Sequence, residues 1–174
     1  SGLTLKHTAT ADDKPIILTL ATGERDMQLN DIIGAINFQA PDEQSGTDAI
    51  KVCAGIEAVS EGDFAFDNNA TKLSFKTAAS ETAAEKMSLS SAGVLTVSGD
   101  IVPGAADGAS LGTSSKEFSD LFLADQAVIS FGNDQDVTLT HVHNSGLTLL
   151  HTATGDDEPI ILTLATDEQD IQAS

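Results

Sequence analysis

The stretch AIKVCAGIEAV (residues 49–59) alternates between two kinds of side chain. Ile50, Val52, Ala54, Ile56 and Ala58 fall on every second position, and a period of two is the period of a β-strand. The same alternation recurs in LTLKHT (3–8), IILTLAT (16–22), TKLSFKT (71–77), VLTV (94–97) and DVTLTHVH (136–143). Turn-forming stretches such as SEGD, DNNA and HNSG separate these runs, so the sequence predicts an all-β fold of many short strands.

Two stretches carry a weaker helical pattern. SETAAEKMSLS (80–90) offers a serine cap followed by alanine and glutamate, and SSKEFSDLFLAD (114–125) spaces its apolar residues as a helix would. Both stretches are short, and the second leads directly into the expected strand AVISF. We interpret both as turns that decorate a β scaffold.

The chain repeats itself. Residues 145–172 match residues 1–28 at 22 of 28 positions, without a gap and at an offset of 144. Self-similarity at a fixed period is the signature of a repeat architecture, and the 174 residues hold one full period and the start of the next. We therefore interpret the chain as an excerpt from a longer array whose unit is a whole domain.

The repeat and the composition together divide the chain into four segments. Residues 1–29 begin the repeat and correspond to residues 145–174, which begin the next one. Residues 30–98 form the expected main β module. The stretch SGDIVPGAADGASLG is rich in glycine and alanine and predicts a loop or neck, so residues 99–144 are expected to hold a neck and a second small β module.

The composition is strongly acidic. The formal net charge is −19, from 27 acidic and 8 basic residues. Nucleic acid and anionic membrane surfaces both bind through lysine and arginine, so the balance argues against either partner. No apolar run approaches the roughly 18 residues of a membrane span.

The expected core is thin for a chain of this length. Leu, Ile, Val and Phe make up 44 of 174 residues, and Trp and Tyr are absent. This content exceeds that of disordered chains, yet one chain has little apolar surface to bury alone. The composition therefore favours a core shared between chains. The single cysteine, Cys53, excludes an intrachain disulfide and is interpreted as a small buried strand residue.

The apolar strand faces are the residues expected to carry assembly. They are Ile16, Leu18, Leu20, Ile33, Phe38, Ile50, Val52, Ile56, Phe75, Leu89, Val128, Phe131, Val137 and Leu139.

No catalytic constellation stands out in the sequence. GASLG (108–112) matches the pattern of a nucleophile elbow, but that motif needs a strand before it and a helix after it, and here a loop and a turn are expected instead. The chain is therefore expected not to be an enzyme. A glycan-cleaving tailspike would need a groove with paired acids and usually aromatics, and the lack of Trp and Tyr argues against it.

Several longer stretches resemble modules of phage tail fibres. They are NDIIGAINFQAPDEQSGTDAIKVCAGIEAVSEGDF (30–64), TKLSFKTAASETAAEKMSLSSAGVLTVSGDI (71–101) and LGTSSKEFSDLFLADQAVISFG (111–132), and NDQDVTLTHVHNSGL (133–147) is similar to marine phage structural proteins. The resemblance implies parallel homotrimers with β-rich domains on a three-fold axis. It also implies an extracellular place in the virion and a role in reaching the host, whose receptor would be bound by a part outside this excerpt.

The motif HVH (141–143) is the sharpest candidate for a site. His141 and His143 point the same way on an ideal strand and continue the face of Val137 and Leu139. In a parallel trimer the two histidines would supply six imidazoles on the axis, and imidazole suits iron and other transition metals. The alternatives are a hydrogen-bonded histidine layer or a strand-end pair in solvent. No metal or other cofactor is favoured, and His141 and His143 are the only metal candidates. His7 and His151, at the same place in successive repeats, are expected to hydrogen-bond into the adjoining TAT turn.

The sequence thus predicts an all-β module of a trimeric phage tail fibre, with a mechanical role. The alternative is a bacterial adhesin or extracellular filament built of tandem β-domains. Trimers with a shared core favour the first interpretation, and a closed monomeric sandwich favours the second.

Overall fold

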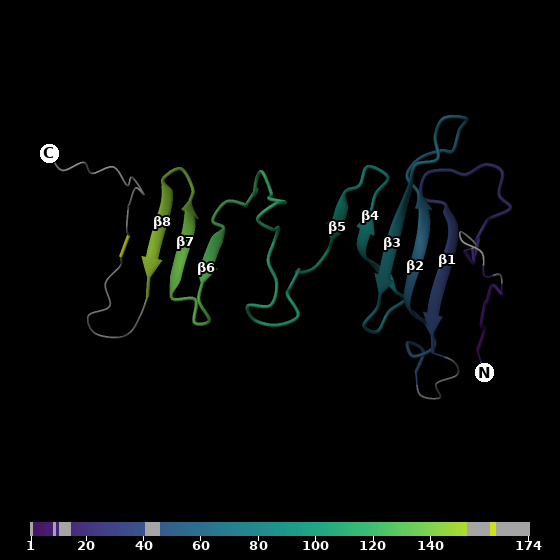
Figure 1. Cartoon of the computed structure of the whole chain (residues 1–174), viewed down its shortest axis with the longest axis horizontal. Coiled ribbons are helices and arrows are strands. Elements are labelled where there is room, and N and C mark those ends of the chain that lie inside the picture. Colours follow the sequence, from purple (N-terminus) through teal and green to yellow (C-terminus); the bar gives the residue numbers. More distant parts are fainter. Residues whose placement is uncertain (1, 9, 11–14, 41–45, 153–160, 163–174) are drawn as a thin grey trace. The chain divides into compact units, whose positions relative to one another are not determined.

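A computed structural model of the chain shows an all-β protein. The structure describes residues 2–8, 10, 15–40, 46–152 and 161–162, and these residues contain eight strands and no helix. The chain divides into two compact units, Ser1–Ala109 and Ser110–Ser174. Each unit holds one antiparallel sheet (Figure 1).

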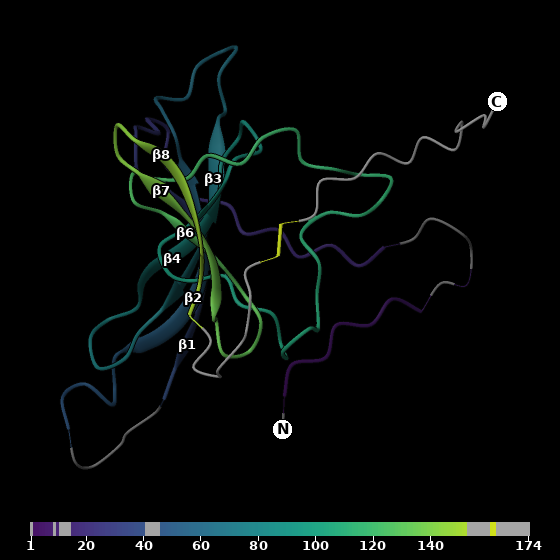
Figure 2. The ribbon, with the colours of Figure 1, turned by 90° about the vertical axis from the view of Figure 1, so that its left-hand side faces the viewer.

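The first unit contains a five-stranded meander. Its strands are β1 (Ile32–Gln39), β2 (Val52–Ser60), β3 (Thr71–Thr77), β4 (Ala84–Leu89) and β5 (Leu95–Val97). They lie side by side in sequence order, and Figure 2 shows β1, β2 and β3 fanned out by the twist that antiparallel sheets adopt. Bulges interrupt β1 beside Ile33 and the β3–β4 pair after Phe75.

Sequence alternation located β2 and β3 well. The strand pattern of residues 71–77 coincides with β3, and that of residues 49–59 covers most of β2. The expected turn at residues 80–90 is wrong, because β4 occupies Ala84–Leu89 and pairs with β3. Residues 16–22 were expected to form a strand but belong to none.

A tight polar turn fixes the start of the meander. Ser60, with 1% of its surface exposed, donates its hydroxyl to Gln28 O and accepts from Asp31 N. Asn30, at φ 73, adopts the left-handed conformation inside this turn. These bonds hold Met27, which is 8% exposed, against the end of the sheet, and Phe64 N donates to Met27 O at 2.9 Å.

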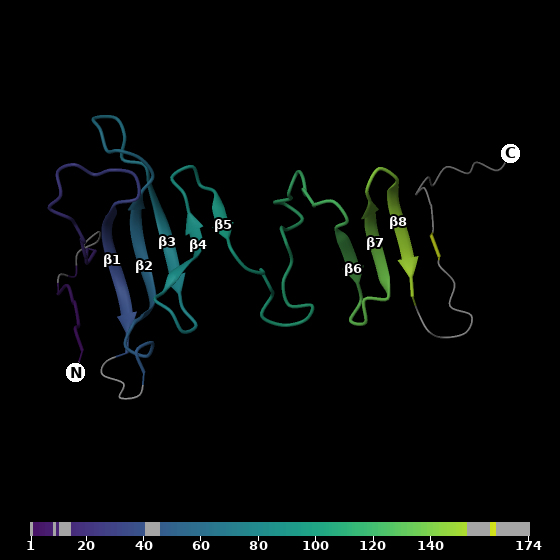
Figure 3. The ribbon, with the colours of Figure 1, turned by 180° about the vertical axis from the view of Figure 1, so that it is seen from behind.

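The second unit contains a three-stranded sheet in the order β6 (Val128–Phe131), β7 (Val137–Val142), β8 (Gly146–His151). Figure 3 shows its strands from behind. The 30 residues between β5 and β6 belong to none of the strands. The boundary that the sequence repeat places between residues 144 and 145 runs through this sheet, because β8 lies beyond it and pairs with β7.

Candidate interaction surface

One face of the five-stranded sheet is almost wholly apolar. The register places Gly34, Ala58, Leu73, Leu89 and Leu95 in one row across all five strands. A second row runs parallel to it: Ile36, Ile56, Phe75, Met87 and Val97. Phe38 and Ala54 continue the same side because side chains alternate along each strand. We call these twelve residues the apolar face.

The apolar face is open to solvent. Ile56 in the middle of the sheet is 38% exposed, Phe38 is 54% exposed and Leu95 is 58% exposed. No further strand or helix occurs among the described residues of this unit to cover the face. Met27, Val59 and Ala83 are the only buried apolar residues in the described part of the chain, and none of them lies on the apolar face.

The opposite face of the same sheet is polar yet better buried. Glu57 is 9% exposed, Ser74 is 2% exposed and Ser88 is 8% exposed. They occupy one row of the register together with Ala35 and Thr96. In a sheet that packs its apolar side against a core within one chain, the apolar side chains would be buried and the polar ones exposed.

Long charged side chains cover this polar row. Lys76 Nζ lies 2.7 Å from Glu57 Oε1, and Lys72 Nζ lies 2.8 Å from Glu85 Oε2. The hydrogen bonds from Lys72, and then from Ser74, lower the pKa of the Glu85 carboxyl below its ordinary value. The described residues contain no buried side-chain nitrogen or oxygen without a partner, so the polar face is complete within one chain.

A segment of the first repeat copy touches one corner of the apolar face. Leu20 lies so close to Gly34 that a Cβ on Gly34 would come within 2.9 Å of Leu20 Cβ. A shallow hollow of about 150 Å³ remains here, lined in part by Leu20, Ile36, Ile56 and Leu73. Leu20 itself stays 44% exposed, so the segment shields only part of the face.

The small sheet also has one apolar face and one more polar face, but the two differ less than in the five-stranded sheet. Ile129, Leu139 and Leu149 form one row, and Phe131, Val137 and His151 form the next. With His141 and Leu147 these residues make the small apolar face, on which Ile129 is 36% exposed and Leu149 is 39% exposed. The other face carries the hydroxyl side chains of Ser130, Thr138, Thr140 and Thr148, together with Val128, Val142 and Leu150.

The strand residues expected to carry assembly are therefore only partly brought together. Phe38, Val52, Ile56, Phe75 and Leu89 share the side of the apolar face. Phe131, Val137 and Leu139 share the small apolar face, but Val128 lies on its hydroxyl-bearing side. Ile16, Leu18, Leu20 and Ile50 lie outside the strands, and Ile33 sits at the bulge in β1.

His141 and His143 converge on one carboxylate. The Nδ1 atom of His143 lies 3.1 Å from Asp125 Oδ2, and that of His141 lies 3.6 Å from Asp125 Oδ1. His141 ends the small apolar face, whereas His143 follows β7 in the hairpin turn. The described residues contain no cluster of three or more His, Cys, Asp or Glu side chains suited to a metal ion. The six-imidazole cage stays a hypothesis, since it needs three chains.

His151 has a structural contact that sequence reasoning missed. Its Nε2 atom lies 3.1 Å from Asp136 Oδ2, and Thr152 N donates to Asp136 O at 2.8 Å. The contact joins the end of β8 to the residue that precedes β7. The expected bond into the TAT turn stays a prediction, because residues 153 and 154 of that turn lie outside the described residues.

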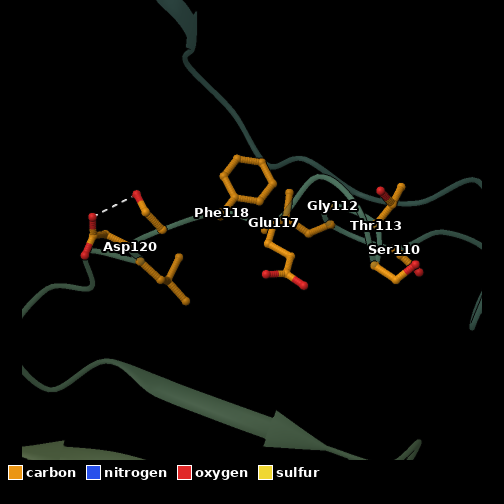
Figure 4. A pocket seen from close by; sticks show the side chains of 10 residues that line it. Ser110, Gly112, Thr113, Glu117, Phe118 and Asp120 are labelled. Carbon is orange, nitrogen blue, oxygen red and sulfur yellow. Dashed lines mark hydrogen bonds between the residues drawn. The ribbon is translucent and has the colours of Figure 1, made fainter.

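Two further candidate side chains, Cys53 and Ser110, are exposed. Cys53 was expected to be buried but is exposed; it lies near the start of β2, and its Sγ lies 3.2 Å from Phe38 O. Ser110 lies in a surface loop that curls around a hollow of about 710 Å³ (Figure 4). Within this loop the side chains of Glu117 and Phe118 point to opposite sides (Figure 4), and no histidine lines the hollow to act as a base.

Comparisons of this chain with protein-family models, curated proteins and solved structures found no match. The described residues include no helix of the length and apolarity needed to span a membrane. The function must therefore be argued from the surfaces of the chain and from its repeat.

Proposed function

We propose that this chain is a repeat module of a trimeric phage tail fibre, with a mechanical rather than a catalytic role. Three chains would pack their apolar faces around a common axis, and the tandem repeat would set the length of the shaft. The observation that carries the proposal is the open apolar face of the five-stranded sheet. On the opposite side of that sheet, the charged side chains are paired within one chain.

The exposed area supports a core shared between chains. Ile36, Phe38, Ile56, Leu73, Leu89 and Leu95 are each 38–58% exposed. Full burial of such a side chain stabilises by about 1.5–3 kcal/mol. Covering the exposed half of all six would thus contribute about 4–9 kcal/mol per chain.

The charge of the chain supports an assembly that stays soluble and buries the apolar face. The net charge of −19 keeps the outer surface soluble and discourages sideways aggregation. The apolar face itself carries no charged residue, so the chains can approach there without burying an unpaired ion. The resemblance of residues 30–64 and 71–101 to tail-fibre modules is the reason for proposing three chains and a virion.

The mass of the folded particle tests this proposal. Native mass spectrometry and light scattering on residues 1–174 at micromolar concentration should give three chains. Two chains would replace the trimer by a sandwich of two apolar faces. A stable monomer would refute the shared core and favour the adhesin-type array of independent β-domains.

A further inference from the structure

Two nearly identical segments of this chain adopt different structures. Residues 2–7 read GLTLKH and β8 (Gly146–His151) reads GLTLLH, so only Lys6 and Leu150 differ. The second segment is a strand of the small sheet, whereas residues 2–7 belong to no strand. Local sequence cannot explain this difference, so the surroundings of the segment must.

The surroundings of β8 are provided by β7. The register runs from Val142 opposite Gly146 at the hairpin turn to Val137 opposite His151 at the far end. Thr152 N and the carboxylate contact of His151 then attach the end of the strand to Asp136. Among the described residues, the second copy of the segment follows the β6–β7 hairpin and the first copy does not.

The leucines of the segment are more covered in the strand. Leu147 is 69% exposed and Leu149 is 39% exposed, against 86% for Leu3 and 50% for Leu5 at the corresponding positions. Leu149 stands opposite Leu139, which in turn stands opposite Ile129. The segment therefore completes a row of apolar side chains when a hairpin is beside it.

We propose that residues 2–7 are the third strand of a small sheet whose other two strands, β6 and β7, belong to another copy of this repeat. Each copy then contributes a hairpin at its end and accepts the opening strand of the copy that follows. The structural unit of the array becomes residues 8–151, which is one period shifted by seven residues from the unit that the alignment suggests. This pairing goes beyond the proposed function and holds for any filament built of these repeats.

The test adds a hairpin in front of the whole chain. Residues 110–144 are placed before Ser1, so that an Asn144 precedes Ser1 as it precedes Ser145 in the chain itself. Hydrogen exchange is measured at the amides of residues 3–7 and of residues 147–151, in the extended chain and in residues 1–174. A matched control carries Leu139→Asp in the added copy alone.

In residues 1–174 the amides of residues 3–7 should exchange at least about tenfold faster than those of residues 147–151. In the extended chain the two sets should exchange within about tenfold of each other, and the control should restore the difference. Leu5→Asp should lower the melting temperature of the extended chain as Leu149→Asp does, and leave that of residues 1–174 unchanged. Unprotected amides at residues 3–7 in the extended chain would overturn the proposal.

Discussion

A charge placed on the apolar face should separate the chains without unfolding them. Leu95 and Thr96 are neighbours on the short strand β5 and point to opposite sides of the sheet. Leu95→Asp puts a carboxylate on the apolar face, and Thr96→Asp puts the same group on the polar face. Both positions are exposed in the single chain, so neither substitution removes a buried contact within one chain.

The expected size of the effect follows from the exposure of Leu95. Its side chain is 58% exposed, and full burial of a leucine stabilises by about 1.5–3 kcal/mol. Covering the exposed part in the proposed trimer would therefore contribute about 0.9–1.7 kcal/mol per chain, or about 3–5 kcal/mol per trimer. Since 1.4 kcal/mol is a factor of ten, Leu95→Asp should raise the dissociation constant by about two to four powers of ten. Burial of the carboxylate adds a further cost.

Sedimentation equilibrium over a range of protein concentrations measures this constant. Leu95→Asp should populate monomers at concentrations where the parent chain and Thr96→Asp remain trimers. Circular dichroism should show the same β spectrum for all three proteins, which separates dissociation from unfolding. Equal dissociation constants for Leu95→Asp and Thr96→Asp would refute the assignment of the apolar face as the interface.

Three further outcomes follow from the charges of the chain. Raising the salt from about 0.02 M to about 0.5 M should strengthen association measured by light scattering, because screening weakens repulsion between chains of net charge −19; weaker association would indicate a charge-paired interface. Glu57→Ala should lower the free energy of unfolding in urea by about 1–3 kcal/mol, because it leaves the Lys76 ammonium without its ion-pair partner. The double variant with Glu57→Leu and Lys76→Met should have a free energy of unfolding within about 1 kcal/mol of the parent chain. The pKa of Glu85 is lowered in the fold by Lys72 and Ser74, so its contribution to stability is present above its ordinary pKa of 4.5 and is lost as the pH falls below that value. Glu85→Gln should therefore lose less stability than the parent chain between about pH 5 and pH 3 in urea titrations, and equal losses would contradict the role of this pair.

The period-two alternation of side chains correctly predicted strands that pair with a neighbouring strand. It also predicted strands in segments that pair with none. Residues 71–77 read as a strand and form β3, which is paired on both edges. Residues 16–22 carry an equally regular pattern but belong to no strand. A pattern of period two reports which side chains could share a face, whereas a strand also needs an edge that satisfies its backbone.

The opposite error, a strand that the sequence analysis did not predict, occurred at β4 for a similar reason. Residues 80–90 have the serine, alanine and glutamate of a helix start, yet pairing with β3 overrides that preference. The bulge after Phe75 also places Lys86 out of step with the strand period. The apolar content of Met87 and Leu89 was visible in the sequence, but the register that adds them to the apolar face was not.

The candidate surface could be anticipated in kind but not in detail. Composition alone indicated that one chain has too little apolar side chain for a core, and the open apolar face agrees with that expectation. Which face stays open could not be read from the sequence, because the ion pairs beside Ser74 join Lys72 and Lys76 of its own strand to glutamates on β4 and β2. Spacing on one strand likewise could not show that Asp125, from before β6, lies between His141 and His143.

The phase of a repeat is a property that sequence comparison leaves open. An alignment of residues 1–28 with residues 145–172 fixes the period at 144 but gives no reason to cut the array at one residue rather than another. Hydrogen-bonded pairing gives that reason, because a cut between β7 and β8 removes a strand from the small sheet, whereas a cut after His151 leaves it whole. If each junction is a shared sheet, the shaft depends on two kinds of contact, the apolar faces between chains and β8 between successive repeats. Leu95→Asp and Leu149→Asp then act on different contacts, so the first should change the number of chains in a particle and the second the order within the small sheet.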